Sequence, residues 1–137
     1  MSDNKFDKLI GFLERLEKDN IGEWITDENP KDAKDAVIRL PYPKYSETVT
    51  ELIAAVYEFA QENPEYELIN YREQLEKRGI DDYEDADVSN MDAKGIMALF
   101  MAMVRSERFC AGAIMEMIKS GAVKQWLLRL KELSQMQ

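Results

Sequence analysis

The sequence predicts an all-α fold, a compact single-domain bundle of about six helices. Apolar residues recur at spacings of three and four along most of the chain, which is the period of helices that bury one face. The 137 residues are 45% hydrophobic and 33% charged, a balance typical of one globular domain over residues 1–137. Two of the four prolines lie near residues 36–45, where a Pro-rich non-helical segment is expected.

The first helix is expected over residues 3–19. Its buried stripe comprises Phe6, Leu9, Ile10, Leu13 and Leu16. Helical periodicity then breaks, and Trp24 and Ile25 are expected to fold back onto the core. Pro41 and Pro43 lack the N–H that a central strand needs, so no sheet is expected in this part of the chain.

Two further helices are expected before the middle of the chain. Ser46 is placed to cap the first of them, because its hydroxyl can accept a hydrogen bond from an unpaired backbone N–H. This helix should end near Asn63–Pro64, since the residue before a proline avoids the helical region. The second covers residues 64–80, with Gly79 as the left-handed residue of a Schellman motif.

An acidic loop over residues 81–89 is expected to join the N-terminal and C-terminal helices. Ser89 and Asp92 resemble the capping box that starts a helix, with Asp in place of the usual Glu or Gln. The segment that follows, residues 91–105, is apolar on nearly all sides. Such a helix is typically central in its domain.

Two helices are expected in the remaining residues. The periodicity leaves open whether a new helix starts at Ser106 or the preceding one continues through it with a kink. The packed face of this segment should comprise Phe109, Cys110, Ala113, Ile114, Met117 and Ile118. Gly121 should end it, and the last helix covers residues 122–133 with Arg129 facing water.

The charge of the chain is unevenly distributed. Residues 1–89 hold 11 basic and 23 acidic residues, a balance of −12, whereas residues 90–137 hold 7 and 4, a balance of +3. An acidic protein is not expected to bind nucleic acid directly, because that affinity rests on neutralised phosphates. The negative charge of residues 1–89 instead favours a protein partner with a basic surface. Alternatively, this charge only keeps the protein soluble.

The sequence lacks the residues that most common catalytic mechanisms need. There is no histidine and only one cysteine, which excludes Ser-His-Asp and Cys-His nucleophiles and the usual zinc sites. No Gly-rich phosphate loop is present. Cys110 lies on the apolar face of its expected helix, so it should pack rather than react. We therefore expect no catalytic residue, metal or cofactor, and favour a protein that is not an enzyme.

No apolar run approaches the roughly 18 to 20 residues that span a bilayer, so no membrane association is expected. The first 20 residues are too charged for a signal peptide. The expected location is the cytoplasm.

The most suggestive cluster is Arg105, Glu107 and Arg108, at an expected helix junction. An arginine there could hold helix carbonyls and a carboxylate together as a structural clamp. Alternatively, these residues could form a small polar binding pocket with Tyr45 or Tyr42 from the Pro-rich segment.

Parts of the sequence resemble a known family. The segments "LPYPKYSETVTELIAAVYEF" and "RSERFCAGAIMEMIKSG", with Pro41, Tyr42, Tyr45 and Ser46 in the first and Arg105 to Gly112 in the second, resemble the uncharacterised bacterial and phage family of unknown function numbered 6508. The resemblance extends over nearly the whole chain. It implies a bacterial cell or phage-infected host as the source and carries no activity to transfer.

Three hypotheses for function follow. The leading one is a small acidic module that binds a protein partner, in its sharper form a phage or mobile-element inhibitor of a nucleic-acid-binding defence enzyme. The alternative is a small-molecule-binding protein or enzyme with a pocket around Arg105, Glu107, Arg108 and Tyr45. The third is a homo-oligomer that packs through Met101, Met115 or Trp126.

Overall fold

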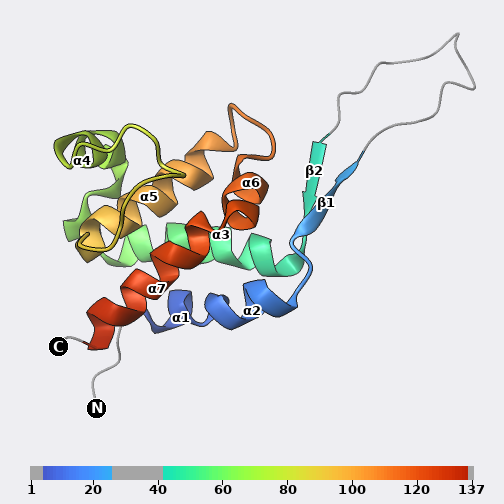
Figure 1. Cartoon of the computed structure of the whole chain (residues 1–137), viewed down its shortest axis with the longest axis horizontal. Helices are drawn as coiled ribbons and strands as arrows, with labels where there is room; N and C mark the ends of the chain where they lie inside the picture. Colours follow the sequence, from blue (N-terminus) through green and yellow to red (C-terminus); the bar gives the residue numbers. More distant parts are fainter. Residues whose placement is uncertain (1–4, 26–41, 136–137) are drawn as a thin grey trace, which may run out of the picture.

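The computed structural model describes residues 5–25 and 42–135 (Figure 1). Its α-helices are α1 (Asp7–Ile10), α2 (Phe12–Lys18), α3 (Glu47–Glu62), α4 (Tyr71–Lys77), α5 (Ala93–Ser106), α6 (Ala113–Ser120) and α7 (Ala122–Gln135). Because α1 and α2 follow one another with only Gly11 between them, the described residues form six helical segments in the expected order. The predicted mostly helical class is confirmed.

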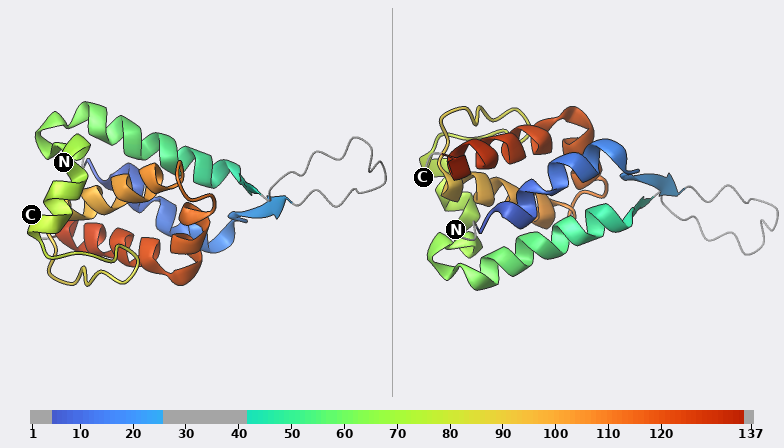
Figure 2. Two further views of the ribbon diagram at one scale, coloured as in Figure 1. Left: turned by 90° about the horizontal axis from the view of Figure 1, so that it is seen from above. Right: turned by 90° about the horizontal axis from the view of Figure 1, so that it is seen from below.

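Helix α5 is the centre of the bundle. It contacts α3, α4, α6 and α7, and the other helices surround it in both views of Figure 2. Ten consecutive residues of α5 are buried, from Gly95 to Val104. A helix that is apolar on all sides has to lie in the core, so the predicted central position is confirmed.

The methionines and the tryptophan considered for an oligomer contact are part of this core. Met101 is 5% exposed, Met115 2% and Trp126 1%. The Trp126 ring packs edge-on against Phe100 with the centroids 5.1 Å apart. Packing of a second subunit through these three residues is therefore wrong, because the chain itself covers them.

Helix α3 begins and ends where its sequence signals lie. The Ser46 hydroxyl accepts a bond from the Val49 N–H at 3.4 Å, and the helix ends at Glu62 with Asn63 before Pro64. Its 16 residues span about 24 Å, nearly the length of the bundle (Figure 1).

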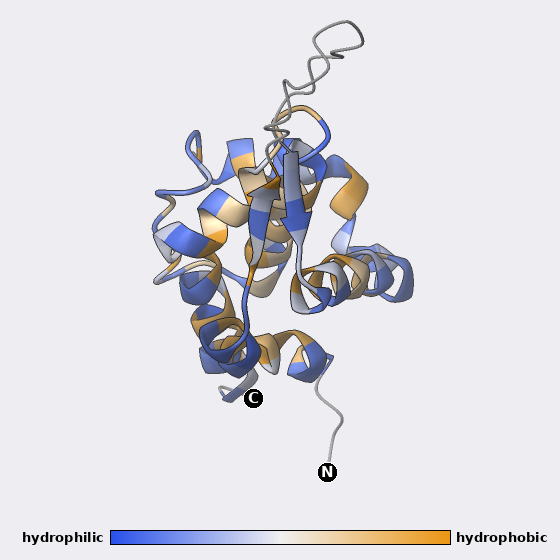
Figure 3. Ribbon diagram, turned by 90° about the vertical axis from the view of Figure 1, so that its right-hand side faces the viewer, coloured by the Kyte–Doolittle hydropathy of each residue, from blue (hydrophilic) through white to orange (hydrophobic). Residues whose placement is uncertain are grey.

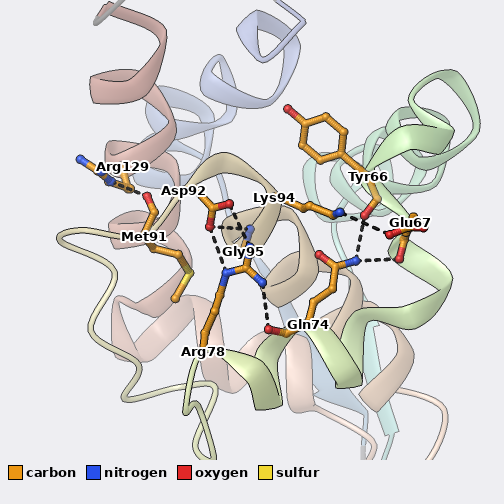
Figure 4. A network of polar contacts seen from close by, with 9 residues as sticks. All are labelled: Tyr66, Glu67, Gln74, Arg78, Met91, Asp92, Lys94, Gly95 and Arg129. Carbon is orange, nitrogen blue, oxygen red and sulfur yellow. Dashed lines mark hydrogen bonds and ion pairs between the residues drawn. The ribbon is translucent and has the colours of Figure 1, made fainter.

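The single helix expected over residues 64–80 is wrong in its first half. Two short 3₁₀ turns, η1 (Pro64–Tyr66) and η2 (Leu68–Asn70), precede α4, with Glu67 between them at a φ of 49°. The cause is Gln74, whose buried amide donates to the Tyr66 and Glu67 carbonyls at 2.8 and 2.7 Å (Figure 4). The Tyr66 carbonyl therefore bonds to a side chain, and the Glu67 carbonyl is shared between Gln74 and the Asn70 N–H of the 3₁₀ turn.

The end of α4 is a Schellman motif, as predicted. The N–H of Gly79 donates to the Glu76 carbonyl at 2.9 Å, and that of Ile80 donates to the Leu75 carbonyl at 3.0 Å. Leu75 is fully buried and Ile80 packs against the same core.

The start of α5 differs from the predicted capping box. Asp92 is the N-cap and accepts from the Gly95 N–H at 3.4 Å, while the Ser89 hydroxyl donates to Asp87. Both Asp92 oxygens also accept from the Arg78 guanidinium, at 3.0 and 2.9 Å (Figure 4). Arg78 lowers the pKa of the Asp92 carboxyl below its ordinary value. This ion pair joins the C-terminus of α4 to the N-terminus of α5.

Arg129 does not face water as predicted. Its side chain is only 14% exposed, and its Nε donates to the Met91 carbonyl at 2.8 Å (Figure 4). The guanidinium donates to a carbonyl that has no partner within a helix. The bond therefore holds α7 against the segment that leads into α5.

A small sheet is present where none was expected. Strands β1 (Gly22–Ile25) and β2 (Tyr42–Tyr45) pair antiparallel, with Trp24 opposite Pro43. A sheet of two strands has only edge strands, and an edge tolerates the missing N–H of a proline. Trp24 is 44% exposed and is not folded into the core as predicted.

Among the described helices, none combines the length and apolar character needed to cross a bilayer.

Candidate functional site

The sheet lies at one end of the bundle, beside the loop that joins α5 to α6 (Figure 1). Figure 3 views the molecule from this end, with the two strands in front of the helices. We call the two strands together with residues 107–112 the sheet end. All five side chains that the sequence singled out, Tyr42, Tyr45, Arg105, Glu107 and Arg108, lie in or next to it.

The two faces of the sheet differ. The strand register places Trp24 and Tyr45 on one face, because side chains alternate along a strand and directly paired residues share a face. This face lies against the start of α6. Tyr42 and Lys44 are on the other face, and both are exposed.

Glu107 joins the sheet to α6. Its Oε1 accepts from the Tyr45 hydroxyl at 2.6 Å and from the Ile114 N–H at 2.9 Å, and its Oε2 accepts from the Gly112 N–H at 2.7 Å. The first N–H groups of a helix have no partner within the helix, and they favour a negative charge. The Glu107 carboxylate accepts hydrogen bonds from two of these N–H groups and places a negative charge at the start of α6. We call this set of bonds the Glu107 clamp.

Tyr45 is held from two sides. Its hydroxyl donates to Glu107 and accepts from the Met115 N–H at 3.3 Å. Burial and, to a smaller extent, the bond to Glu107 raise the pKa of the Tyr45 phenol above its ordinary value, because both disfavour a phenolate beside a carboxylate.

Gly112 allows the sheet to approach α6 closely. Its φ is 91°, and a Cβ at this position would lie 2.3 Å from Cζ2 of the Trp24 ring. A residue with a side chain would therefore displace the indole and strain the backbone. The glycine explains how one edge of the Trp24 ring can lie close to the turn that leads into α6.

Neither alternative left open for Ser106, a new helix capped there or a continuous helix with a kink, is found. Ser106 is the last residue of α5, and its hydroxyl donates to the Ala102 carbonyl at 2.6 Å instead of capping a new helix. Its own carbonyl accepts from the N–H groups of Phe109 and Cys110 at 3.0 and 2.9 Å, which forms a tight turn. Phe109 is 83% exposed and Cys110 is exposed, so their predicted packing in the core is wrong.

The predicted site residues are brought together only in part. Tyr45 and Glu107 meet, although Tyr42 lies on the opposite face of the sheet. Arg105 is half-buried and Arg108 is exposed, and within the described ranges neither guanidinium makes a hydrogen bond or an ion pair. The junction is thus held by the carboxylate of Glu107, and the structural clamp expected of an arginine is wrong.

A shallow hollow of about 520 Å³ lies beside the clamp. Its lining comprises Trp24, Glu84, Ala111, Gly112, Met115, Glu116, Lys119 and Ser120. Neither arginine lines it. Sequence reasoning missed Trp24 as a surface residue, because a tryptophan next to an isoleucine is more typical of a core.

In the part of the chain that the structure describes, no group of three or more acidic or cysteine side chains is placed to hold a metal ion. The carboxylate and phenol of the Glu107 clamp are bonded to each other and to backbone N–H groups. This arrangement is suited to holding elements in place.

The Tyr45 phenol predicts a dependence of stability on alkaline pH. Tyr45→Phe should lower the free energy of unfolding by about 1 to 2 kcal/mol near neutral pH, because it removes the hydroxyl that donates to Glu107 and accepts from the Met115 N–H. Because the folded pKa of Tyr45 is raised, its stabilising effect is complete below about pH 10 and declines as the pH rises further. The stability difference between the wild type and Tyr45→Phe should therefore shrink above pH 10 in urea titrations. A constant difference up to pH 11.5 would contradict this assignment.

Comparison with known proteins identifies the family of the chain. Residues 1–136 match the model of a family described as a family of unknown function, DUF6508. Searches of curated proteins and of solved structures returned no match. The resemblance carried by the Pro-Tyr and Arg-x-Glu-Arg segments is thereby confirmed, and the chain belongs to the DUF6508 family.

Proposed function

We propose that the protein is a non-enzymatic module that binds another protein through the sheet end. The observation that carries this proposal is Phe109, an aromatic side chain that is 83% exposed on a turn fixed at both of its ends. Leaving a phenylalanine in water forgoes the stabilisation of burying it, about 1.5–3 kcal/mol. Aromatic residues are enriched at protein interfaces, and a rigid support lowers the ordering cost of binding through one.

Two further exposed aromatic side chains belong to the sheet end, one on each face of the sheet. Trp24 is 44% exposed and Tyr42 51% exposed, and both belong to the sheet. Tryptophan and tyrosine are enriched among the residues that contribute most to protein interfaces. The Glu107 clamp holds this surface in place before a partner arrives, which reduces the ordering cost of binding.

The acidic charge supports a basic partner. Carboxylates along the helices are neutralised by ion pairs such as Lys8–Glu58, Lys94–Glu67 and Lys124–Glu17. In contrast, the five carboxylates between residues 81 and 87 make no ion pair with any residue that the structure describes. We propose as the sharper form that a bacterial cell, phage or mobile element uses the protein to inhibit a nucleic-acid-binding defence enzyme in the cytoplasm.

The small-molecule alternative has less support. Arg105 and Arg108 do not line the hollow, and the polar atoms of Tyr45 and Glu107 are already bonded. A ligand at Arg105, Glu107, Arg108 and Tyr45 would have to break the Glu107 clamp first.

Site-specific photo-cross-linking tests the proposed function. A photoreactive phenylalanine analogue placed at position 109 should form a discrete covalent adduct with one protein in cells of the source organism. The matched control is position 69, because Ile69 is 88% exposed and lies in η2, after the C-terminal end of α3 and away from the Ser46 end that joins the sheet. Adducts of the same mass and yield from both positions, or none from position 109, would overturn the proposal.

A further inference from the structure

We infer that the hollow beside Trp24 receives a lysine or arginine side chain of the protein partner. The inference deepens the proposed function and rests on it. It specifies which kind of partner side chain binds at the hollow, where the Trp24 ring and two carboxylates without an ion pair lie together.

The first support is the position of the indole. One edge of the Trp24 ring rests against Gly112, and the side chain still exposes 44% of its surface at the rim of the hollow. An ammonium or guanidinium over an exposed indole face is attracted by the ring electrons, and tryptophan is the best aromatic residue for this contact. The hollow is shallow, and its volume of about 520 Å³ leaves room for a long side chain to lie across it.

The second support is the charge of the lining. Glu84 comes from the acidic loop and Glu116 from the first turn of α6, so two separate elements each bring a carboxylate to the hollow. Among the described residues neither carboxylate is ion-paired. Both are free to bind a cation, and an ammonium or guanidinium beside them would form charge-assisted hydrogen bonds.

One residue of the lining, Lys119, carries a positive charge that opposes the binding of a cation and provides a further test. Lys119 also borders the hollow, one turn after Glu116 on α6. Its ammonium repels an incoming cation, although a flexible lysine stem can turn its charge toward water. Removing this charge should therefore strengthen the binding of a cationic side chain, whereas it should weaken the binding of an anionic one.

The neighbouring carboxylates provide a matched control. Asp81 is exposed in the same acidic loop as Glu84 but does not line the hollow. If overall negative charge alone attracted a cation, Asp81 and Glu84 would matter equally. If the hollow is a site, only Glu84 matters strongly.

The experiment is a titration of the whole chain with a seven-residue Gly/Ser peptide that carries one central arginine, followed by two-dimensional NMR at 0.15 M salt. The indole N–H signal of Trp24, identified with Trp24→Phe, and the Gly112 amide should shift. Glu84→Gln and Glu116→Gln should each raise the dissociation constant about two- to fivefold, as for exposed ion pairs. Lys119→Gln should lower it by a similar factor, and Asp81→Asn should change it much less than Glu84→Gln, because Asp81 does not line the hollow and salt screens exposed charges that make no direct contact.

Three results would overturn the inference: equal shifts with a peptide that carries glutamine, larger shifts with one that carries glutamate, or equal weakening by Asp81→Asn and Glu84→Gln. The outcome is separable from that of the proposed function. If position 109 cross-links one protein but the arginine peptide does not shift Trp24, only the cationic occupant is wrong. If position 109 gives no specific adduct, the protein-binding function itself is wrong.

Discussion

Replacement of Glu107 by alanine should lower the free energy of unfolding by about 2 to 3 kcal/mol, measured by urea denaturation at neutral pH. The variant removes an acceptor of three hydrogen bonds and leaves the N–H groups of Gly112 and Ile114 and the Tyr45 hydroxyl without it. Bonds to a charged group contribute more than neutral ones, and partly buried donors that lose their acceptor destabilise the fold. The start of α6 and strand β2 should become mobile together.

Two variants control for this result. Glu107→Gln keeps the size of the side chain but places an NH₂ group where one oxygen accepted a bond, so it should fall between wild type and alanine. Glu76→Ala removes an exposed glutamate whose side chain has no partner in the described ranges, and it should change stability by less than about 0.5 kcal/mol. A loss at Glu107 no larger than the loss at Glu76 would show that the clamp does not hold the sheet end.

Gly22→Ala should detach the sheet and cost about 2 to 3 kcal/mol of stability. The φ of Gly22 is 144°, and a Cβ would lie 2.4 Å from the Lys44 carbonyl oxygen and 2.9 Å from Cα of Tyr45. Both contacts are with backbone atoms, so a side-chain rotation cannot relieve them. The strands have to separate, and the Ser46 N–H, which donates to the Ile21 carbonyl at 2.9 Å, should exchange with solvent much faster.

The matched control is Gly11→Ala. Gly11 has an ordinary helical φ of −57° between α1 and α2, and the nearest atom to its Cβ would be the Lys8 carbonyl oxygen at 3.4 Å. Alanine favours a helix more than glycine, so this variant should be neutral or stabilising by up to about 1 kcal/mol. Equal destabilisation at both glycines would contradict the role assigned to Gly22.

The features predicted correctly from the sequence depend on neighbouring residues. The Ser46 cap, the Schellman motif at Gly79 and the end of α3 before Pro64 each need only a few consecutive residues to form. The central position of α5 follows equally directly, because a helix with apolar residues on all sides has no face for water.

The features that sequence reasoning missed depend on contacts between distant residues. The sheet needs Gly22 to lie opposite Tyr45, and a short strand with a proline carries almost no pattern of its own. The four-residue spacing placed Phe109 and Cys110 on a buried helical face, yet the Ser106 turn ends the helix before them. The 3₁₀ turns before α4 likewise follow from Gln74, whose side chain competes for the Tyr66 and Glu67 carbonyls.

The candidate site could be named from the sequence but its roles could not be assigned. The Arg105, Glu107 and Arg108 cluster was correctly placed at a helix junction with Tyr45 nearby. Which side chain holds the junction depends on where the first N–H groups of α6 point, and these select an acceptor over a donor. An arginine has no acceptor atom, so only the glutamate could take that position.

The sheet end therefore combines a rigid base with an exposed surface. Glu107, Tyr45 and Gly112 fix the arrangement, while Trp24 and Phe109 remain in contact with water. Stability measurements test the residues that hold the sheet end together, and binding measurements test its exposed side chains.

A Phe109→Ser variant should keep the wild-type free energy of unfolding to within about 0.5 kcal/mol, since the Phe109 side chain makes little contact with the rest of the chain. Urea denaturation measures this difference.

The proposed protein-binding function is tested most directly by the yield of photo-cross-linked adduct from position 109 compared with position 69. Both side chains are more than four-fifths exposed, at 83% and 88%, so exposure alone cannot distinguish them. We expect one discrete adduct from position 109 and none from position 69. An excess of unmodified wild-type chain should abolish the adduct, because it competes for the partner. The same adducts in the same yield from both positions would contradict it.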